Sequence, residues 1–216
     1  MFRLLLLLIG FSALSCASRP TFRIHEKPIA YDAVRDSLSL QYLQQRHGLD
    51  VSSTAITPEM IVVHWTAVPT LEATYEVFNP VLLGGRPELS SASALNVSAH
   101  FLVDRNGSIW RLLPDTAFGR HTIGLNYMAI GIENIGGPDA PLTRAQLKAN
   151  AALIEHLQRR HNIRYVIGHH EYEAFKDSPL WKETDPDYIT KKQDPGDAFM
   201  RRLRKKLGRD RFQSQP

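Results

Sequence analysis

The residues of this chain that are best placed to do chemistry are two of its nine histidines and one glutamate. His64 and His169 each come at the end of an apolar, β-branched run typical of a buried strand, and Glu133 ends a third such run. Two imidazoles and a carboxylate suit zinc, which they bind at about 2.0–2.2 Å, and a catalytic zinc site keeps one position open. The pattern therefore predicts a metal cluster, with satisfied buried polar side chains as the alternative.

Strand alternation predicts the direction of each of these side chains. Residues two apart in a strand share a face, so His64 lies on the face of Val62 and His169 on the face of Ile167. Glu133 shares its face with Gly131.

The other histidines are given different roles. His100 is expected to be structural, and His170 is expected to point away from His169 and to lie outside the metal shell. The remaining ones in polar or helical surroundings are expected to face solvent: His25, His47, His156 and His161.

The elements that must position these side chains follow from the same periodicities. Strands are expected at 60–63, 99–103, 108–113, 128–134 and 164–168, with Asn106-Gly107 as a hairpin turn between the second and the third. A helix is expected at 33–47, and another begins at Thr143 with a capping box completed by Gln146. Strands interleaved with helices predict an α/β or mixed layered domain. A long loop at 84–93 is a candidate lip for a substrate groove.

Length and composition agree with one catalytic domain plus extensions. The chain has 216 residues, 43% hydrophobic and 22% charged, which allows a sizeable core and excludes a membrane channel or transporter. Its net charge of +4 arises at the C-terminus, where 200–212 holds seven basic residues against Asp210 alone. This basic stretch is not a body-wide nucleic-acid surface, so no nucleic-acid partner is expected. Its apolar stripe predicts a docked C-terminal helix, with contact to anionic lipid or wall polymer as the alternative.

The N-terminus has the pattern of an export signal. Arg3 precedes eleven largely apolar residues at 4–14, too few to span a membrane, and small residues then lead to Cys16. This resembles a bacterial lipoprotein signal, which implies that residues 1–15 are removed and that Cys16 is lipidated; simple secretion is the alternative. Ala17 is compatible with outer-membrane sorting. Because Cys16 is the only cysteine, the domain has no disulfide and no thiolate ligand.

Six ordered segments between Glu59 and Phe199 resemble one family. They are V-V-H-W-T-A (62–67), N-V-S-A-H-F (96–101), R-H-T-I-G (120–124), A-I-G-I-E-N (129–134), V-I-G-H-H (166–170) and K-Q-D-P-G (192–196). Together they are similar to the type 2 zinc-dependent N-acetylmuramoyl-L-alanine amidases, relatives of phage-lysozyme-type amidases and peptidoglycan recognition proteins. The resemblance implies a central mixed β-sheet flanked by helices and a peptidoglycan or muropeptide substrate.

The resemblance also assigns roles, residue by residue. It implies that zinc is held by His64, His169 and Asp194, the last a carboxylate because the domain has no cysteine. The I-G-I-E glutamate, Glu133, would transfer protons, and the lysine two residues before the ligand, Lys192, would share the charge of the oxyanion. Lys191 adjoins it, so this assignment could shift by one residue.

The same resemblance implies that His121, in R-H-T-I-G, lines the substrate groove near the metal and binds substrate.

One departure from the family concerns the third ligand. The 22 residues between His169 and Lys192 exceed those of compact members, and they contain a second Asp-Pro at Asp185. Asp194 is preferred because it keeps the two-residue spacing from lysine and the following glycine.

The expected organisation is a signal at 1–15, a lipidated tether and extension at 16–55, and a zinc amidase domain at 56–210. The expected activity is cleavage of the amide between N-acetylmuramic acid and L-alanine in cell-wall remodelling or recycling, by a monomer facing the periplasm. A peptidoglycan-binding module without activity and a zinc peptidase acting within stem peptides are the competing readings, and the retained ligand set argues against the first.

Overall fold

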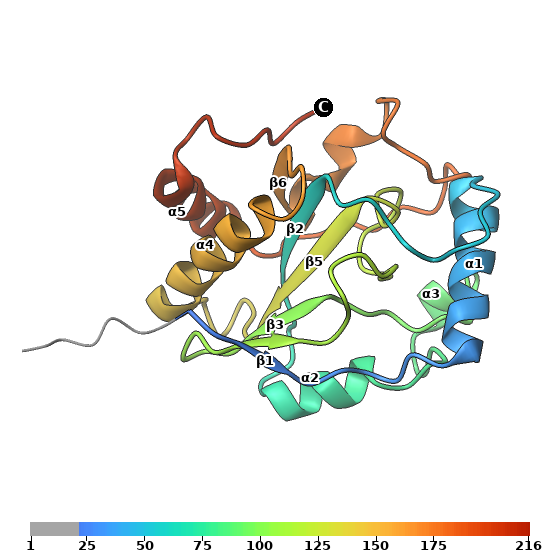
Figure 1. Ribbon diagram of the computed structural model, residues 1–216, viewed down its shortest axis with the longest axis horizontal. Coiled ribbons are helices and arrows are strands. Elements are labelled where there is room, and N and C mark those ends of the chain that lie inside the picture. Colours follow the sequence, from blue (N-terminus) through green and yellow to red (C-terminus); the bar gives the residue numbers. More distant parts are fainter. Residues whose placement is uncertain (1–21) are drawn as a thin grey trace, which may run out of the picture.

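A six-stranded mixed sheet forms the centre of the molecule (Figure 1). The structure is a computed structural model that describes residues 22–216, without the side chains of Pro87 and Glu88. Within this part the sheet order is β1-β4-β3-β5-β2-β6, and only β3 and β4 pair antiparallel. The strands are β1 (Ile24–Glu26), β2 (Met60–Trp65), β3 (Phe101–Val103), β4 (Ile109–Arg111), β5 (Ala129–Asn134) and β6 (Tyr165–Gly168). The predicted mixed sheet is therefore confirmed.

The turn between β3 and β4 is the predicted hairpin. Asp104 N–H donates to the Ser108 carbonyl at 2.9 Å, and Gly107 has a φ of 89°, which glycine adopts without strain. Both strands are shorter than the expected 99–103 and 108–113.

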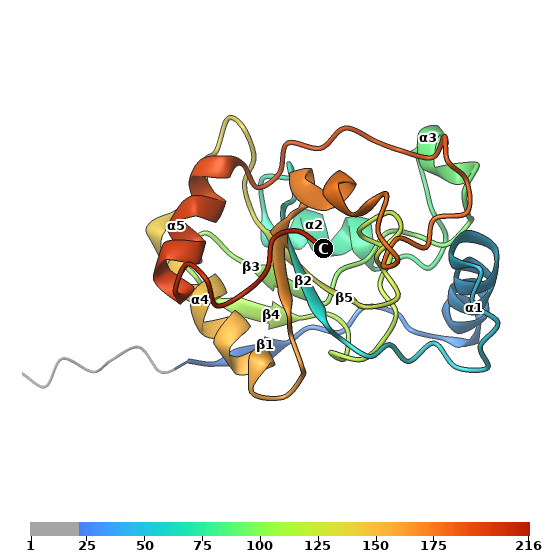
Figure 2. The same ribbon diagram turned by 90° about the horizontal axis from the view of Figure 1, so that it is seen from above.

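One face of the sheet is covered by α4 (Arg144–Gln158) and α5 (Asp197–Leu207). Figure 2 shows the two helices side by side at the end of the molecule where the described chain begins. The capping box of Thr143 and Gln146 is present at the start of α4. The apolar stripe of α5 is buried in the core, which confirms the docked helix: Phe199, Met200, Leu203 and Leu207.

The opposite face carries most of the loops and the remaining helices. These are α1 (Ala33–His47), which has its predicted bounds, α2 (Leu71–Phe78), α3 (Pro87–Ser90) and the 3₁₀ helix η1 (His169–Phe175). Side chains alternate along β2 as expected, because Ile61 and Val63 pack toward α4 and α5 while Met60 and Val62 pack on the other side. His64 continues the second series, so it faces the loops.

Several features differ from the sequence prediction. β1, α2 and η1 were not anticipated, and α3 lies inside the predicted loop at 84–93. β1 and α3 are too short for a periodic signal. The expectation that His47 faces solvent was wrong: it is buried among Tyr42, Phe118 and Tyr127, and burial lowers its pKa to about 4.

The predicted signal segment and Cys16 lie outside the described residues. Among those that are described, no helix has the length and apolarity needed to cross a membrane.

Candidate metal and catalytic site

Three side chains from separate segments converge at the carboxyl ends of β2 and β6. His64 Nδ1 lies 2.9 Å from His169 Nδ1, and Asp194 Oδ2 lies 3.2 Å from the first and 3.1 Å from the second. All three residues are buried. These are the three residues that the family resemblance implied, and the structure brings them together.

The sheet register explains why the two histidines meet. β2 and β6 are parallel neighbours, with Val63 opposite Gly168, so the next residues along each chain leave the sheet at the same edge. Asp194 arrives from the irregular segment that precedes α5.

The donor set fits a metal ion. Two unprotonated imidazole nitrogens and a carboxylate oxygen are a common zinc-binding combination, and each of the three residues directs one such atom at the other two. Burial alone would raise the pKa of Asp194, but the adjoining rings of His169 and His64 hold it well below its usual range. Burial and the neighbouring His64 lower the pKa of His169 to about 4. The carboxylate and the neutral imidazole are the forms that bind metal.

Glu133 is a half-buried acid beside this cluster. It is opposite His64 in the β2–β5 register, and its Oε2 has no hydrogen bond among the described residues. Burial, and then the negative charge of Asp194, raise its pKa well above the usual range, while the charges of Arg86 and Lys192 oppose this. An unpaired buried carboxyl group in a cleft has the features of a proton-transfer group.

Lys192 lines the same cleft as Glu133, whereas Lys191 does not. Lys191 is exposed and pairs with Glu173 at 2.8 Å. The geometry therefore favours Lys192 over its neighbour as the cation beside the reacting groups.

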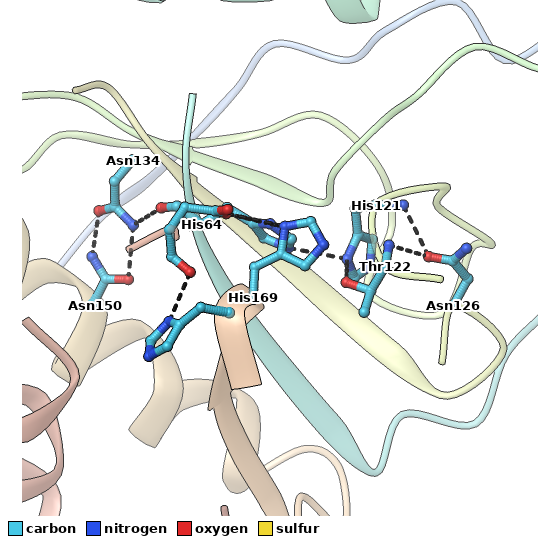
Figure 3. Close-up of polar contacts among 9 residues, drawn as sticks. His64, His121, Thr122, Asn126, Asn134, Asn150 and His169 are labelled. Carbon is cyan, nitrogen blue, oxygen red and sulfur yellow. Dashed lines mark hydrogen bonds and ion pairs between the residues drawn. The ribbon is translucent and has the colours of Figure 1, made fainter. Parts of the chain in front are cut away.

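His121 lines the cleft, and its ring also contacts the ring of His64 (Figure 3). Its Nε2 donates to the Ala129 carbonyl at 3.1 Å, and burial keeps its pKa well below the usual value, so the ring is neutral. Its Nδ1 can then accept both from the Thr122 hydroxyl at 2.8 Å and from His64 Nε2 at 3.2 Å, which leaves the Nδ1 lone pair of His64 free toward the cluster. The sequence analysis missed this contact, and a role in substrate binding stays a prediction.

Glycine at position 131 makes room for this arrangement. A Cβ atom there would lie 2.8 Å from the His121 ring, closer than any real contact. A glycine inside a buried strand was the signal that could have revealed the approach.

Two buried amides hold the other side of β2 (Figure 3). Asn134 Nδ2 donates to the His64 carbonyl at 3.0 Å, and Asn150 of α4 donates to Asn134 Oδ1 at 2.6 Å. His64 is therefore fixed through both its main chain and its ring. His100 is structural as expected, because its ring accepts from Gly131 N–H and donates to the Ala117 carbonyl.

The second Asp-Pro lies away from the cluster. Asp185 accepts the Asp187 N–H at 3.0 Å and lies 3.6 Å from Arg46 of α1, and its side chain is 46% exposed. Glu183 pairs with the same arginine at 2.7 Å. This part of the long segment packs on α1 and is not among the residues that line the cleft.

The cluster opens into a cleft of about 260 Å³. Arg86 and Leu89 of the predicted lip line it, as does Arg120, whose buried guanidinium donates to the carbonyls of Leu89 and Ser93 and to Tyr188. The sequence analysis named neither arginine, although Arg120 stands in R-H-T-I-G and Arg86 is the one cation of its loop.

Comparison with known proteins defines the family. Residues 53–197 match the N-acetylmuramoyl-L-alanine amidase family model (Amidase_2), and the chain belongs to this family. The endolysins of Escherichia phage T7 and Klebsiella phage KP32 are 30% and 29% identical over 83 residues, 36% of this chain and 55% of each endolysin. The chain thus spans about half the length of these curated relatives.

Solved structures show the same fold. The N-acetylmuramoyl-L-alanine amidase LysC from Clostridium intestinale URNW aligns with a TM-score of 0.52 at 21% identity, covering 87% of this chain and 98% of LysC. A selenomethionine derivative of AmpD aligns with a TM-score of 0.54 at 21% identity, covering 85% of this chain and 94% of AmpD.

Proposed function

We propose that the protein is a zinc-dependent N-acetylmuramoyl-L-alanine amidase that cleaves the amide between the lactyl group of N-acetylmuramic acid and L-alanine of the stem peptide. The observation that carries the proposal is the convergence of His64, His169 and Asp194 beside Glu133, whose Oε2 has no hydrogen bond among the described residues. Family membership supports the reaction, and the cluster opens into a cleft of about 260 Å³ that Glu133 and Lys192 also line. All these groups come from one chain, in keeping with a monomer.

The residues divide the chemistry between them. Zinc held by His64, His169 and Asp194 would supply an acidified water and polarise the scissile carbonyl. Glu133 takes a proton from the attacking water and delivers it to the leaving nitrogen of L-alanine as the carbon–nitrogen bond breaks. The Lys192 ammonium attracts the negative charge that develops on the carbonyl oxygen. The products are the muramic acid carboxylate and a stem peptide with a free amino terminus.

Purified muropeptides provide the direct test of this activity. The protein should release a stem peptide that begins with free L-alanine, as measured by mass spectrometry of the products. A chelator should abolish release because the water then loses its activation, and added zinc should restore it.

The products separate the proposal from its competitors. Shorter peptides would identify a peptidase that cuts within the stem, and binding without any product would identify a recognition module. Release that persists after verified metal removal would contradict the zinc-dependent reaction.

We further propose that the protein is exported and anchored to a membrane, in the outer membrane facing the periplasm, by a lipid on Cys16. The support is the N-terminal sequence: a positive residue, an apolar run and a cysteine preceded by small residues.

A single substitution tests the anchor. The full chain should partition into detergent and fractionate with membranes, whereas Cys16→Ser should be unprocessed or soluble because the acylated thiol is missing. Metabolic labelling with a fatty acid should mark only the unchanged chain. Identical fractionation and labelling of both chains would contradict lipidation.

A further inference from the structure

The side chain of His170 follows a metal-ligand candidate but contacts a different part of the site. Its Nδ1 lies 3.0 Å from the main-chain oxygen of Asp194, and because a carbonyl only accepts, Nδ1 is the donor. Its main-chain N–H donates to the same oxygen at 2.9 Å. Its Nε2 lies 2.9 Å from Asp197 Oδ1, in the first turn of α5.

Asp194 needs such support because its own segment is irregular. No helix or strand is present between η1, which ends at Phe175, and α5, which starts at Asp197. The carboxylate of Asp194 faces His64 and His169, while its carbonyl is held by two hydrogen bonds from His170. Asp194 is thus held at both ends, and its carbonyl is held by one residue, His170, through its ring and its main-chain N–H.

The surrounding residues accommodate the ring closely. A Cβ atom at Gly168 would lie 2.7 Å from His170 Cε1 and 2.9 Å from Pro195 Cδ, so only glycine leaves space for both. Glu171 accepts the Gly168 N–H at 2.7 Å and pairs with Arg204 of α5. The chain is therefore linked to α5 just before His169, where Glu171 connects the Gly168 N–H to Arg204, and just after it, where His170 contacts Asp197.

We infer that His170 is a positioning residue for the third metal ligand: its ring fixes the main chain of Asp194 and joins it to the start of α5. The inference rests on the proposed metal site. His170 touches no other ligand candidate through its ring, and it does not line the cleft. Its loss should therefore weaken metal binding without removing a group that reacts.

Two substitutions separate the ring's two contacts. His170→Asn places an amide N–H at the same bond distance from Cβ as Nδ1, so it can still donate to the Asp194 carbonyl. His170→Gln places its amide one bond further out, where it can reach Asp197 instead. If His170 only stabilises α5, the His170→Gln variant should keep more of the zinc affinity. If His170 positions Asp194, the His170→Asn variant should keep more of it.

Zinc affinity of the full-length chain, measured by competition with a chromophoric chelator, is the decisive measurement. His170→Ala and His170→Gln should each bind zinc about tenfold or more weakly, within the range known for residues that orient ligands, and His170→Asn should stay within about threefold of the unchanged chain. At saturating zinc, kcat of all three should return to near that of the unchanged chain.

His161→Ala is the matched control. His161 also pairs with a carboxylate, Asp115, at 3.1 Å, and its side chain is 14% exposed against 16% for His170. His161 is not among the residues that line the cleft, so the His161→Ala variant should bind zinc as tightly as the unchanged chain.

Each other outcome is informative. Unchanged affinity in His170→Ala, equal affinities of the Asn and Gln variants, or an equal loss in His161→Ala would overturn the inference. If His170→Ala does not fold, the comparison of Asn with Gln still decides. Failure of the unchanged chain to bind zinc would overturn the proposed function itself, and the inference with it.

Discussion

Glu133→Gln should lower turnover of muropeptides by about 100-fold or more while leaving close to one zinc bound per chain. The amide has nearly the size of the carboxyl group but cannot take a proton from water. Because Glu133 Oε2 has no hydrogen bond among the described residues, the substitution breaks none there, and the fold should tolerate it. Activity and zinc content of the same preparation are the two measurements.

Glu183→Gln is the matched control for this experiment. Glu183 is also a glutamate whose pKa is raised by burial, but it pairs with Arg46 and lies outside the cleft lining. Its substitution should leave kcat of the folded protein unchanged. If Glu133→Gln instead loses zinc in proportion to activity, Glu133 is a ligand, as the strand-end pattern alone had allowed.

The strands that carry the site were predictable because they are buried on both faces. Long β-branched runs gave β2, β5 and β6 their positions, and alternation along them gave the faces of His64, Glu133 and His169. Parallel pairing then brings their carboxyl ends to one edge. The positions and faces of residues at the ends of these strands could therefore be predicted from the pattern of apolar residues.

The contacts made by loops could not be predicted in the same way. Asp194 lies in an irregular segment, so no periodicity places it, and only the family resemblance pointed to it. The approach of His121 to His64 and the grip of His170 on Asp194 are tertiary hydrogen bonds between distant segments. Their only sequence traces were glycines, Gly131 and Gly168, whose role depends on what packs against them.

The two Asp-Pro sequences also show that local patterns predict neighbouring contacts but not contacts with distant segments. Lys192 and Asp194 both line the cleft, as expected for residues two apart on one side of an extended chain. Asp185 was judged a turn residue, and it does accept the N–H of Asp187 two positions on. Its second contact, with Arg46 of α1, joins residues 139 apart in the chain, and no local pattern predicts a contact over that separation.

Asp194→Ala should abolish activity and weaken zinc binding by more than about 100-fold, beyond the range for residues that only orient ligands. The substitution removes the oxygen that lies 3.2 Å and 3.1 Å from the two histidine nitrogens, and two imidazoles alone are a poor zinc site. It also leaves the His64 and His169 rings close together without the carboxylate between them. Because the variant binds zinc poorly, added zinc should not stabilise it as it stabilises the unchanged chain.

Asp185→Ala is the comparison that makes this prediction specific. It removes a partly exposed carboxylate beside Arg46, a contact of about 1 kcal/mol or less, so zinc affinity and activity should match the unchanged chain. Zinc titration of the two variants side by side gives the answer. Loss of zinc in Asp185→Ala with retention in Asp194→Ala would mean that the long segment rearranges to offer the other Asp-Pro, and the role of Lys192 beside the oxyanion would fall with it.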